Sequence, residues 1–396
     1  MPGNSPTVFD PSWDPFAADA IHRLADRYGS PLLIVDAERL RERYRRLADA
    51  LPGTRLHFAL KPLPHRAVVE VLRDAGASFD LATNGEVELV RRAGIAPERC
   101  IHTHPIKRDS DIRTALAAGI DTFVVDNPDE LRKFAKHRRQ AGVLIRVAFR
   151  NLGAICDLSR KFGCDPAEVE PLIGLAESLD VRVRGLSFHV GSQAPDPAMH
   201  VEAIEACAGL IARAAARGSA LEILDIGGGF PADYREPMPP IESFCAPIRA
   251  ALAALPRGVQ PIAEPGRTIV APAAIGVSTV MGRAKRGERW WYYLDDGLYG
   301  SYSGRLYDHA SYPIEALSNG GERLPSVLAG PTCDSIDVIE EDIALPLLAI
   351  GDRIVGRSMG AYTWASASEF NFFAKATVLV VDRGRILDER HERHEP

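Results

Sequence analysis

The chain has few cysteines, and none of them forms a CxxC pair. Six cysteines are scattered over 396 residues, which indicates neither a disulfide framework nor a zinc site. The sequence also lacks an apolar run of the roughly 18 residues that a membrane helix needs. Residues 1–14 lack the basic and apolar segments of a signal peptide. We therefore expect a cytoplasmic protein with no membrane partner.

An excess of positive charge is absent as well. The formal net charge is -6, and the arginines of residues 41–46 are interspersed with other residues at helical spacing, so a nucleic-acid partner is not indicated. Hydrophobic residues make up 46% and charged residues 25% of the chain, which is the balance of a globular protein. A chain of this length is expected to form two domains of ordinary size.

Residues 31–270 have the rhythm of a parallel α/β fold. Short apolar runs alternate with longer amphipathic segments, and segments 65–76, 85–94 and 197–218 end at glycine as capped helices do. The candidate strands are residues 32–35, 56–60, 79–82, 100–102, 122–125, 143–148, 183–190, 221–226 and 261–263. This number suits a TIM-type (β/α)8 barrel with one strand to spare, and we assign residues 30–270 to it.

The pattern changes after residue 271. Apolar β runs at 275–281, 290–294, 326–328, 352–355 and 376–381 are joined by turns rich in Gly, Pro and Asp. We predict a second, all-β domain that spans residues 271–383 and includes part of residues 1–29. Residues 384–396 form a charged tail that we expect to be disordered, with its two histidines, His391 and His394, in solvent.

Polar residues lie at or just after the ends of several predicted barrel strands. They are Lys61, Asp80, His189, the glycine run 227–229, Glu264 and Arg267. A TIM barrel builds its active site at the carboxyl ends of its strands. We therefore expect these side chains to converge on one mouth of the barrel.

Each of these residue types has a chemical use. A desolvated lysine such as Lys61, which ends the strand FALK at 58–61, can form a Schiff base with an aldehyde cofactor. The glycines of LDIGGGFP (224–231) let backbone N–H groups approach a phosphate, although a tight structural turn explains them equally well. In EPGR (264–267) the arginine can neutralise a phosphate, and the glutamate can hold a protonated ring nitrogen. His189, taken alone, would be a core histidine.

From about residue 30 to residue 383 the sequence resembles the alanine-racemase-like enzymes that use pyridoxal phosphate, also called fold type III. Within them it looks most like the ornithine and diaminopimelate decarboxylases. The most specific motifs are DGLYGS (296–301), LYDHA (306–310), GPTCDSID (330–337) and MGAYT (359–363). The resemblance implies a barrel with a β domain, pyridoxal 5'-phosphate as cofactor, and decarboxylation of a basic L-amino acid, with L-ornithine to putrescine as the first expectation.

Carried over position by position, the resemblance assigns residues to the cofactor. Lys61 would form the Schiff base, His189 would stack on the pyridine ring, and Glu264 would keep its nitrogen protonated. The residues implied to surround this centre are Asp80, Glu86 and Arg146. The residues implied to hold the phosphate are Ser192, Gly228, Gly229, Arg267 and Tyr362.

The resemblance also implies how the substrate is held. Asp308 and Asp334 match the positions that receive the distal ammonium of ornithine, and Cys333 matches the general acid. The residues that enter the site from a neighbouring subunit in the family match Tyr299, Cys333, Asp334 and Phe370. A two-fold homodimer with shared active sites is therefore implied.

Three segments depart from the family pattern, namely PLPH (62–65) after the lysine, HTHPIK (102–107), and DDG (295–297). The prolines stiffen the loop beside the expected cofactor. Lysine, a modified relative of ornithine, or another amino acid of specialised metabolism therefore stays open as a substrate. A non-catalytic binding paralogue is a further alternative, against which the retention of Lys61, Glu264 and Cys333 argues. His102 and His104 have no third ligand nearby in the sequence, and we expect no metal.

Overall fold

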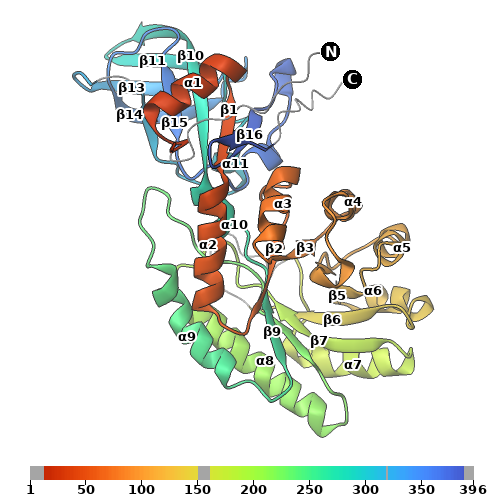
Figure 1. Cartoon of the computed structure of the whole chain (residues 1–396). Helices are drawn as coiled ribbons and strands as arrows, with labels where there is room; N and C mark the ends of the chain where they lie inside the picture. The colour runs from red at the N-terminus through yellow and green to blue at the C-terminus, as the bar shows by residue number, and fades with distance from the viewer. Residues whose placement is uncertain (1–12, 150–160, 318–319, 388–396) are drawn as a thin grey trace. The chain divides into compact units, whose positions relative to one another are not determined.

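The computed structural model describes residues 13–149, 161–317 and 320–387. Within it the chain divides into two compact units (Figure 1). The barrel unit comprises residues 43–232 and 238–268, and the β unit comprises the described parts of residues 1–42, 233–237 and 269–396. The barrel unit thus begins at residue 43, where the sequence placed its start at residue 30. Most of the expected charged tail, with its two histidines, lies outside the described residues.

Eight parallel strands close the barrel in chain order. They are β2 (Arg55–Ala59), β3 (Ser78–Leu81), β4 (Cys100–His102), β5 (Thr122–Val125), β6 (Gly142–Val147), β7 (Arg182–Phe188), β8 (Ile223–Asp225) and β9 (Gln260–Ala263). Strand β9 pairs with β2, which completes the ring. Ile101, Val124, Leu144 and Ile262 form one buried cluster. Because β4 and β9 are not neighbours in the ring, this cluster spans the barrel interior, as the packed core of a TIM barrel does.

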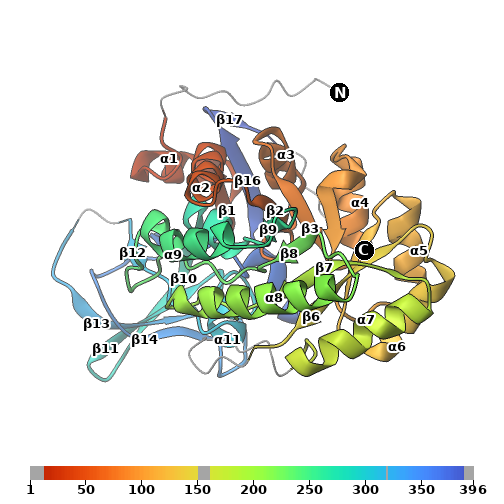
Figure 2. The ribbon, with the colours of Figure 1, turned by 90° about the horizontal axis from the view of Figure 1, so that it is seen from below.

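Helices follow most of the barrel strands. They are α3 (Arg66–Asp74), α4 (Asn84–Arg92), α5 (Asp109–Ala117), α6 (Pro128–Lys133), α7 (Val169–Ser178), α8 (Ala198–Ala216) and α9 (Ile241–Ala253), and α2 (Ala37–Ala50, which begins in the β unit) precedes the first barrel strand. Figure 2 shows α7 and α8 on the outside of the barrel, where α7 contacts β6 and β7, and α8 contacts β7. The three helices predicted to end at glycine do so, since Gly76, Gly94 and Gly218 follow them with positive φ.

The β unit is built on a nine-stranded mixed sheet. Its strands are β1 (Leu32–Asp36), β10 (Ala274–Arg286), β11 (Arg289–Leu294), β12 (Ile314–Ala316), β13 (Leu324–Ala329), β14 (Val338–Leu345), β15 (Arg353–Gly356), β16 (Thr377–Asp382) and β17 (Arg385–Ile386). The spare strand of the barrel prediction is β1, which runs antiparallel to β10 and parallel to β16. The five β runs predicted after residue 271 are present. Strands β12, β14 and β17 were not predicted.

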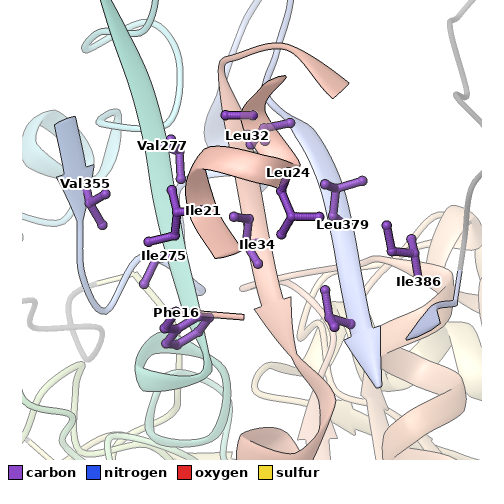
Figure 3. Packing of buried hydrophobic residues seen from close by; sticks show 12 residues of the cluster. Phe16, Ile21, Leu24, Leu32, Ile34, Ile275, Val277, Val355, Leu379 and Ile386 are labelled. Atoms are coloured by element: carbon purple, nitrogen blue, oxygen red, sulfur yellow. The ribbon is translucent and has the colours of Figure 1, made fainter. Parts of the chain in front are cut away.

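Short helices complete the chain. They are α1 (Ala18–Tyr28), α10 (Arg267–Val270), α11 (Gly304–Tyr307), and the 3₁₀ turns Pro97–Arg99, Phe134–Lys136, Pro166–Glu168, Ala271–Ala273, Trp364–Ser366 and Phe370–Phe372. Helix α1 packs Ile21 and Leu24 against Leu32, Ile275 and Leu379 of the sheet, as Figure 3 shows. Each fully buried side chain of this size stabilises the fold by about 1.5–3 kcal/mol. This packing explains why β1 belongs to the β unit.

In the described parts of the chain, no helix combines the length and the apolar character needed to cross a bilayer. Cys100, Cys164, Cys207 and Cys245 are buried, as expected of core residues, whereas Cys333 is exposed. Cys156 lies outside the described residues.

Candidate active site

A cavity of about 220 Å³ lies in the barrel unit. Six residues expected at the site line it, and these are Lys61, Asp80, Glu86, Arg146, His189 and Glu264. Lys61 and Glu264 follow β2 and β9, Asp80 and Arg146 lie one residue before the ends of their strands, and His189 follows β7. The carboxyl ends of five strands therefore supply one mouth, as the barrel topology predicts.

Glu264, which is partly exposed, and the buried Asp225 form an acidic pair in this unit. Asp225 is fully buried on β8, and its Oδ1 accepts a hydrogen bond from Gly227 N at 2.9 Å. Burial raises the pKa of Glu264 well above its ordinary value, and the neighbouring Asp225 raises it further. Burial likewise raises the pKa of Asp225 to about 7. Burial therefore favours the protonated form of this pair.

Lys61 differs from the expectation of a desolvated lysine. It is an exposed residue two positions beyond the end of β2, where the chain turns. The turn packs tightly all the same, since a Cβ on Gly266 would lie 2.7 Å from Pro62 Cγ. Asp80, in contrast, is 5% exposed, and burial raises its pKa well above the ordinary value despite the opposing charge of Lys61. The Thr103 hydroxyl donates a hydrogen bond to Asp80.

Glu86 and Arg146 have structural partners in addition to the cavity. The Glu86 carboxylate accepts a hydrogen bond from Thr83 N at 3.0 Å, and Glu86 N donates to Thr83 Oγ1 at 3.3 Å, which is a capping box at the start of α4. Arg146 lies over the Phe162 ring at 5.5 Å. Burial lowers the pKa of the Arg146 guanidinium and is opposed first by the charge of Glu264.

His189 is held as a neutral ring. Its Nδ1 accepts a hydrogen bond from Gly191 N at 3.0 Å, so the hydrogen of the neutral imidazole is on Nε2. Burial lowers the pKa of His189 well below its ordinary value, and the charges of Lys61 and Arg146 add to this. A Cβ at Gly228 would lie 3.2 Å from His189 Nε2 and 2.8 Å from Glu264 O. Only glycine fits here without displacing backbone.

The expected phosphate residues of the barrel unit lie close together. Arg267 Nη2 donates to Ser192 Oγ at 2.9 Å. Gly229 has a positive φ of 94°, and a Cβ there would lie 2.5 Å from Gly191 O, next to Ser192. The remaining expected member, Tyr362, belongs to the β unit and has a positive φ of 55°.

Contacts in the β unit connect the four residues expected to enter the active site of a neighbouring subunit. The Tyr299 hydroxyl donates to Asp334, and the Tyr299 ring stacks on Phe370 with centroids 4.4 Å apart. Cys333 N donates to Asn371 Oδ1 at 3.3 Å, one residue beyond Phe370. We call Tyr299, Cys333, Asp334 and Phe370 the aromatic-acid patch. Asp308, the fifth residue expected here, caps α11 through a 3.0 Å bond from its N–H to Gly304 O.

The sequence did not single out the residues that hold these groups in place. Asp337 is 2% exposed, and its carboxylate accepts bonds from Leu298 N at 2.7 Å and from Thr332 Oγ1 at 2.7 Å. It thereby joins the two loops of the aromatic-acid patch. A buried acid inside a motif, such as Asp225 or Asp337, was the available signal.

The two histidines weighed as a metal pair have other surroundings. His102 is fully buried with its ring 5.8 Å from that of Phe123. His104 Nδ1 accepts from Ile106 N at 3.1 Å. Among the described residues, no group of three or more side chains of the metal-binding types is arranged to hold an ion.

Comparison with known proteins gives consistent matches. A family model described as pyridoxal-dependent decarboxylase, pyridoxal binding domain, matches residues 37–271. The lysine/ornithine decarboxylase of Selenomonas ruminantium is 34% identical over 369 residues, or 91% of this chain and 92% of that protein. Lysine/ornithine decarboxylase from Vibrio vulnificus complexed with putrescine has a TM-score of 0.89 at 50% identity, covering 92% of this chain and 98% of that one. Its complex with cadaverine has a TM-score of 0.89 at 51% identity, covering 92% and 99%.

Proposed function

The chain belongs to the pyridoxal-dependent decarboxylases, and we propose that it converts L-ornithine to putrescine and carbon dioxide. It is a pyridoxal-phosphate-dependent decarboxylase of basic amino acids with a TIM-type barrel and a β domain. The observation that carries the proposal of a substrate with a distal amine, of which ornithine is the first candidate, is the state of Asp334. The hydrogen bond from Tyr299 lowers the pKa of Asp334. An ionised carboxylate beside aromatic rings is suited to a distal ammonium.

The residues of the barrel unit fit the cofactor. Gly228 and Gly229 have no side chain that could cover their backbone N–H groups, and the Arg267 guanidinium with the Ser192 hydroxyl provides charge and a donor for a phosphate. We assign Glu264 to the ring nitrogen, His189 to the face of the ring, and Lys61 to the aldehyde. Bound pyridoxal phosphate supplies an electron sink for the charge left when carbon dioxide departs.

Glu264 and His189 then have complementary electrostatic roles. The raised pKa of Glu264 means that this carboxyl group can hold a proton between its Oε atom and a basic ring nitrogen. The lowered pKa of His189 keeps the imidazole uncharged, so that it offers a flat surface without competing for that proton. Asp80 and Glu86 line the same cavity as Lys61, and the charge of Lys61 partly opposes the rise that burial causes in the pKa of both carboxyls.

Cys333 is assigned as the general acid. Its thiol is exposed, and its backbone is fixed by Asn371. A cysteine thiol can deliver a proton to the carbon from which carbon dioxide has left, a role that typically contributes about 10²–10⁴ in rate. Asp334, its neighbour, would receive the distal ammonium together with Asp308.

We propose that the aromatic-acid patch acts in the active site of a second copy. Large apolar side chains are exposed near it, with Phe370 at 42%, Phe372 at 99% and Ile336 at 53% exposure. Apolar groups gathered around functional side chains are expected to be covered by another molecule. A two-fold homodimer would bury them and supply each barrel unit with Cys333 and Asp334 from the partner subunit.

Lysine is the second candidate substrate. The observation in its favour is that a similar enzyme, lysine/ornithine decarboxylase of Vibrio vulnificus, was crystallised with cadaverine as well as putrescine. Lysine is one methylene longer than ornithine. Such a difference is worth only about 1–3 kcal/mol of discrimination in an apolar pocket, so activity on both amino acids is compatible with the site.

The test is product analysis by mass spectrometry. The purified protein, supplied with pyridoxal phosphate, is incubated in parallel with L-ornithine, L-lysine, L-arginine and meso-diaminopimelate. Putrescine as the dominant product supports the proposal, and dominant cadaverine would transfer it to lysine. No amine from any of the four would overturn it.

A matched variant sharpens the test. Asp334→Asn is expected to lower kcat/KM for ornithine by about 100-fold, because a charge-assisted bond is worth about 1.5–3 kcal/mol. L-norvaline, which lacks the distal amine, should lose much less. An equal loss for both amino acids would show that Asp334 does not bind the ammonium.

A further inference from the structure

His200 lies on α8, outside the cavity-lining set, and is fully buried. Its Nε2 is 3.0 Å from the carbonyl oxygen of Gly228. The ring stacks on Phe230 with centroids 5.1 Å apart, and its edge meets Phe244 at 6.0 Å. Its other nitrogen, Nδ1, is buried without a hydrogen-bond partner among the described residues. The imidazole is therefore held in one orientation by two rings and one hydrogen bond.

The direction of this hydrogen bond is fixed by chemistry. A carbonyl oxygen only accepts, so Nε2 carries the hydrogen and donates it to Gly228 O. Burial lowers the pKa of His200 to about 4, which keeps the ring neutral and leaves Nδ1 unprotonated at physiological pH. A ring that only filled the space between Phe230 and Phe244 would need no nitrogen at this position. The N–H group of the His200 ring is directed at the glycine run.

The glycine run has each of its three carbonyl groups bonded. Gly227 O accepts from Glu264 N at 2.7 Å, and Gly229 O accepts from Ala194 N at 2.9 Å. Gly228 O accepts from His200. The two outer bonds come from backbone and survive most substitutions. The middle bond comes from a side chain, so its loss can be tested in isolation.

The middle carbonyl determines where the next amide points. In a trans peptide the N–H of Gly229 is directed opposite to the C=O of Gly228. With Gly228 O directed at α8, the Gly229 N–H is directed away from that helix. We propose that His200 is a positioning residue that aims the Gly229 amide at the phosphate of the cofactor. This inference rests on the proposed phosphate role of Gly229, Ser192 and Arg267.

The experiment compares two ligands that differ only in the phosphate. Dissociation constants for pyridoxal phosphate and for pyridoxal are measured by absorbance titration of the wild type, His200→Phe and His200→Gln. Phe keeps the packing between the two rings and removes the donor, whereas Gln restores an N–H donor. We expect His200→Phe to weaken pyridoxal phosphate about tenfold, to leave pyridoxal unchanged, and to be partly rescued by Gln. If the Phe variant does not fold, as judged by thermal unfolding, His200→Leu takes its place.

The same titration separates this inference from the phosphate assignment. Unchanged affinity for pyridoxal phosphate in the Phe variant, or an equal loss for both ligands, overturns the role of His200. Arg267→Ala is the control, and it should weaken pyridoxal phosphate but not pyridoxal. If Arg267→Ala shifts this ratio and His200→Phe does not, only the His200 inference fails. If Arg267→Ala leaves the ratio unchanged, the phosphate site and the inference fail together.

Discussion

The two units treat the same side chain in opposite ways. Asp80 in the barrel unit is buried, and its pKa is raised well above the ordinary value. Asp334 in the β unit accepts a hydroxyl bond from Tyr299, and its pKa is lowered. Among the candidate site residues, the barrel unit therefore has carboxyl groups with raised pKa values, and the aromatic-acid patch has one with a lowered pKa. The raised pKa that Glu264 shares with Asp80 suits its proposed exchange of a proton with a ring nitrogen, and the lowered pKa of Asp334 suits an ammonium ion.

The largest expected effect is a loss of kcat on substitution of a residue in the β unit. Cys333→Ala should lower kcat by about 10²–10⁴-fold, since it removes the proposed general acid, while the affinity for pyridoxal phosphate stays that of the wild type. Steady-state amine production and cofactor titration check the two halves of this statement. Cys245→Ala, a buried cysteine in the barrel unit, is the control and should keep the wild-type kcat in whatever protein folds. A cofactor affinity that falls along with kcat would contradict the division.

A second prediction concerns the buried histidines of the barrel unit. Burial lowers the pKa of His102 to about 4. The unfolded chain, with an ordinary value near 6.5, then binds more protons than the folded chain between these pH values. The contribution of His102 to stability is therefore present above about pH 6.5 and is lost as the pH falls toward 4, at a cost of about 2 kcal/mol by pH 5.

The measurement must remove the opposing titrations. Buried carboxyls with raised pKa values, such as Asp225 and Glu264, change stability in the reverse sense over the same range. The urea unfolding free energy of His102→Phe is therefore compared with that of the wild type at pH 7.5 and at pH 5. Between pH 7.5 and pH 5 the unfolding free energy of the variant should rise by about 2 kcal/mol relative to that of the wild type. Phe123→Leu, which changes the neighbouring ring, should show a difference that is independent of pH, and a flat response of both variants would disprove the assignment.

Lys107 makes a group of buried contacts in the barrel unit. Lys107 Nζ donates to the carbonyls of His104 at 2.7 Å and Val124 at 2.6 Å, and lies 3.3 Å from the Glu130 carboxylate. Both charged side chains are almost fully buried. Lys107→Met should lower the unfolding free energy by about 3 kcal/mol, because it breaks a buried pair. It should also disturb the cavity lined by Thr103 and His104.

The matched control for Lys107 is a lysine on the surface. Lys136 is 59% exposed and pairs with Asp109. Lys136→Met is expected to change the unfolding free energy by about 0.5 kcal/mol or less. Chemical denaturation of both variants checks the difference. If Lys107→Met lowered the unfolding free energy as little as Lys136→Met, the contacts of Lys107 would not stabilise the barrel unit.

Local patterns in the sequence predicted much of the fold and the candidate site. The strand rhythm predicted the barrel, and the strand-end rule predicted that Lys61, His189 and Glu264 would line one cavity. The apolar run of β1 gave no sign of its sheet, because an apolar strand suits a barrel and a mixed sheet equally. Its place follows from pairing with β16, at the far end of the chain. The exposure of Lys61 depended on a turn that the strand pattern did not show.

The supporting residues could not be predicted for the same reason. His200 and Gly228 meet between a helix and a strand-end loop, and Lys107 reaches carbonyls on two segments. Such contacts depend on how distant segments pack, which single-sequence periodicity does not contain. Glu86 shows the converse, since its capping box is visible in the sequence TNGE at 83–86.

The most direct test of the account mixes two inactive variants. Lys61→Ala lacks the proposed anchor of the cofactor in the barrel unit, and Cys333→Ala lacks the proposed acid in the β unit. If each active site takes its barrel unit from one copy and its aromatic-acid patch from another, equal amounts of the two variants, allowed to exchange subunits, should regain about a quarter of the wild-type activity. No recovery from variants that are folded and shown to exchange would contradict the shared-site account.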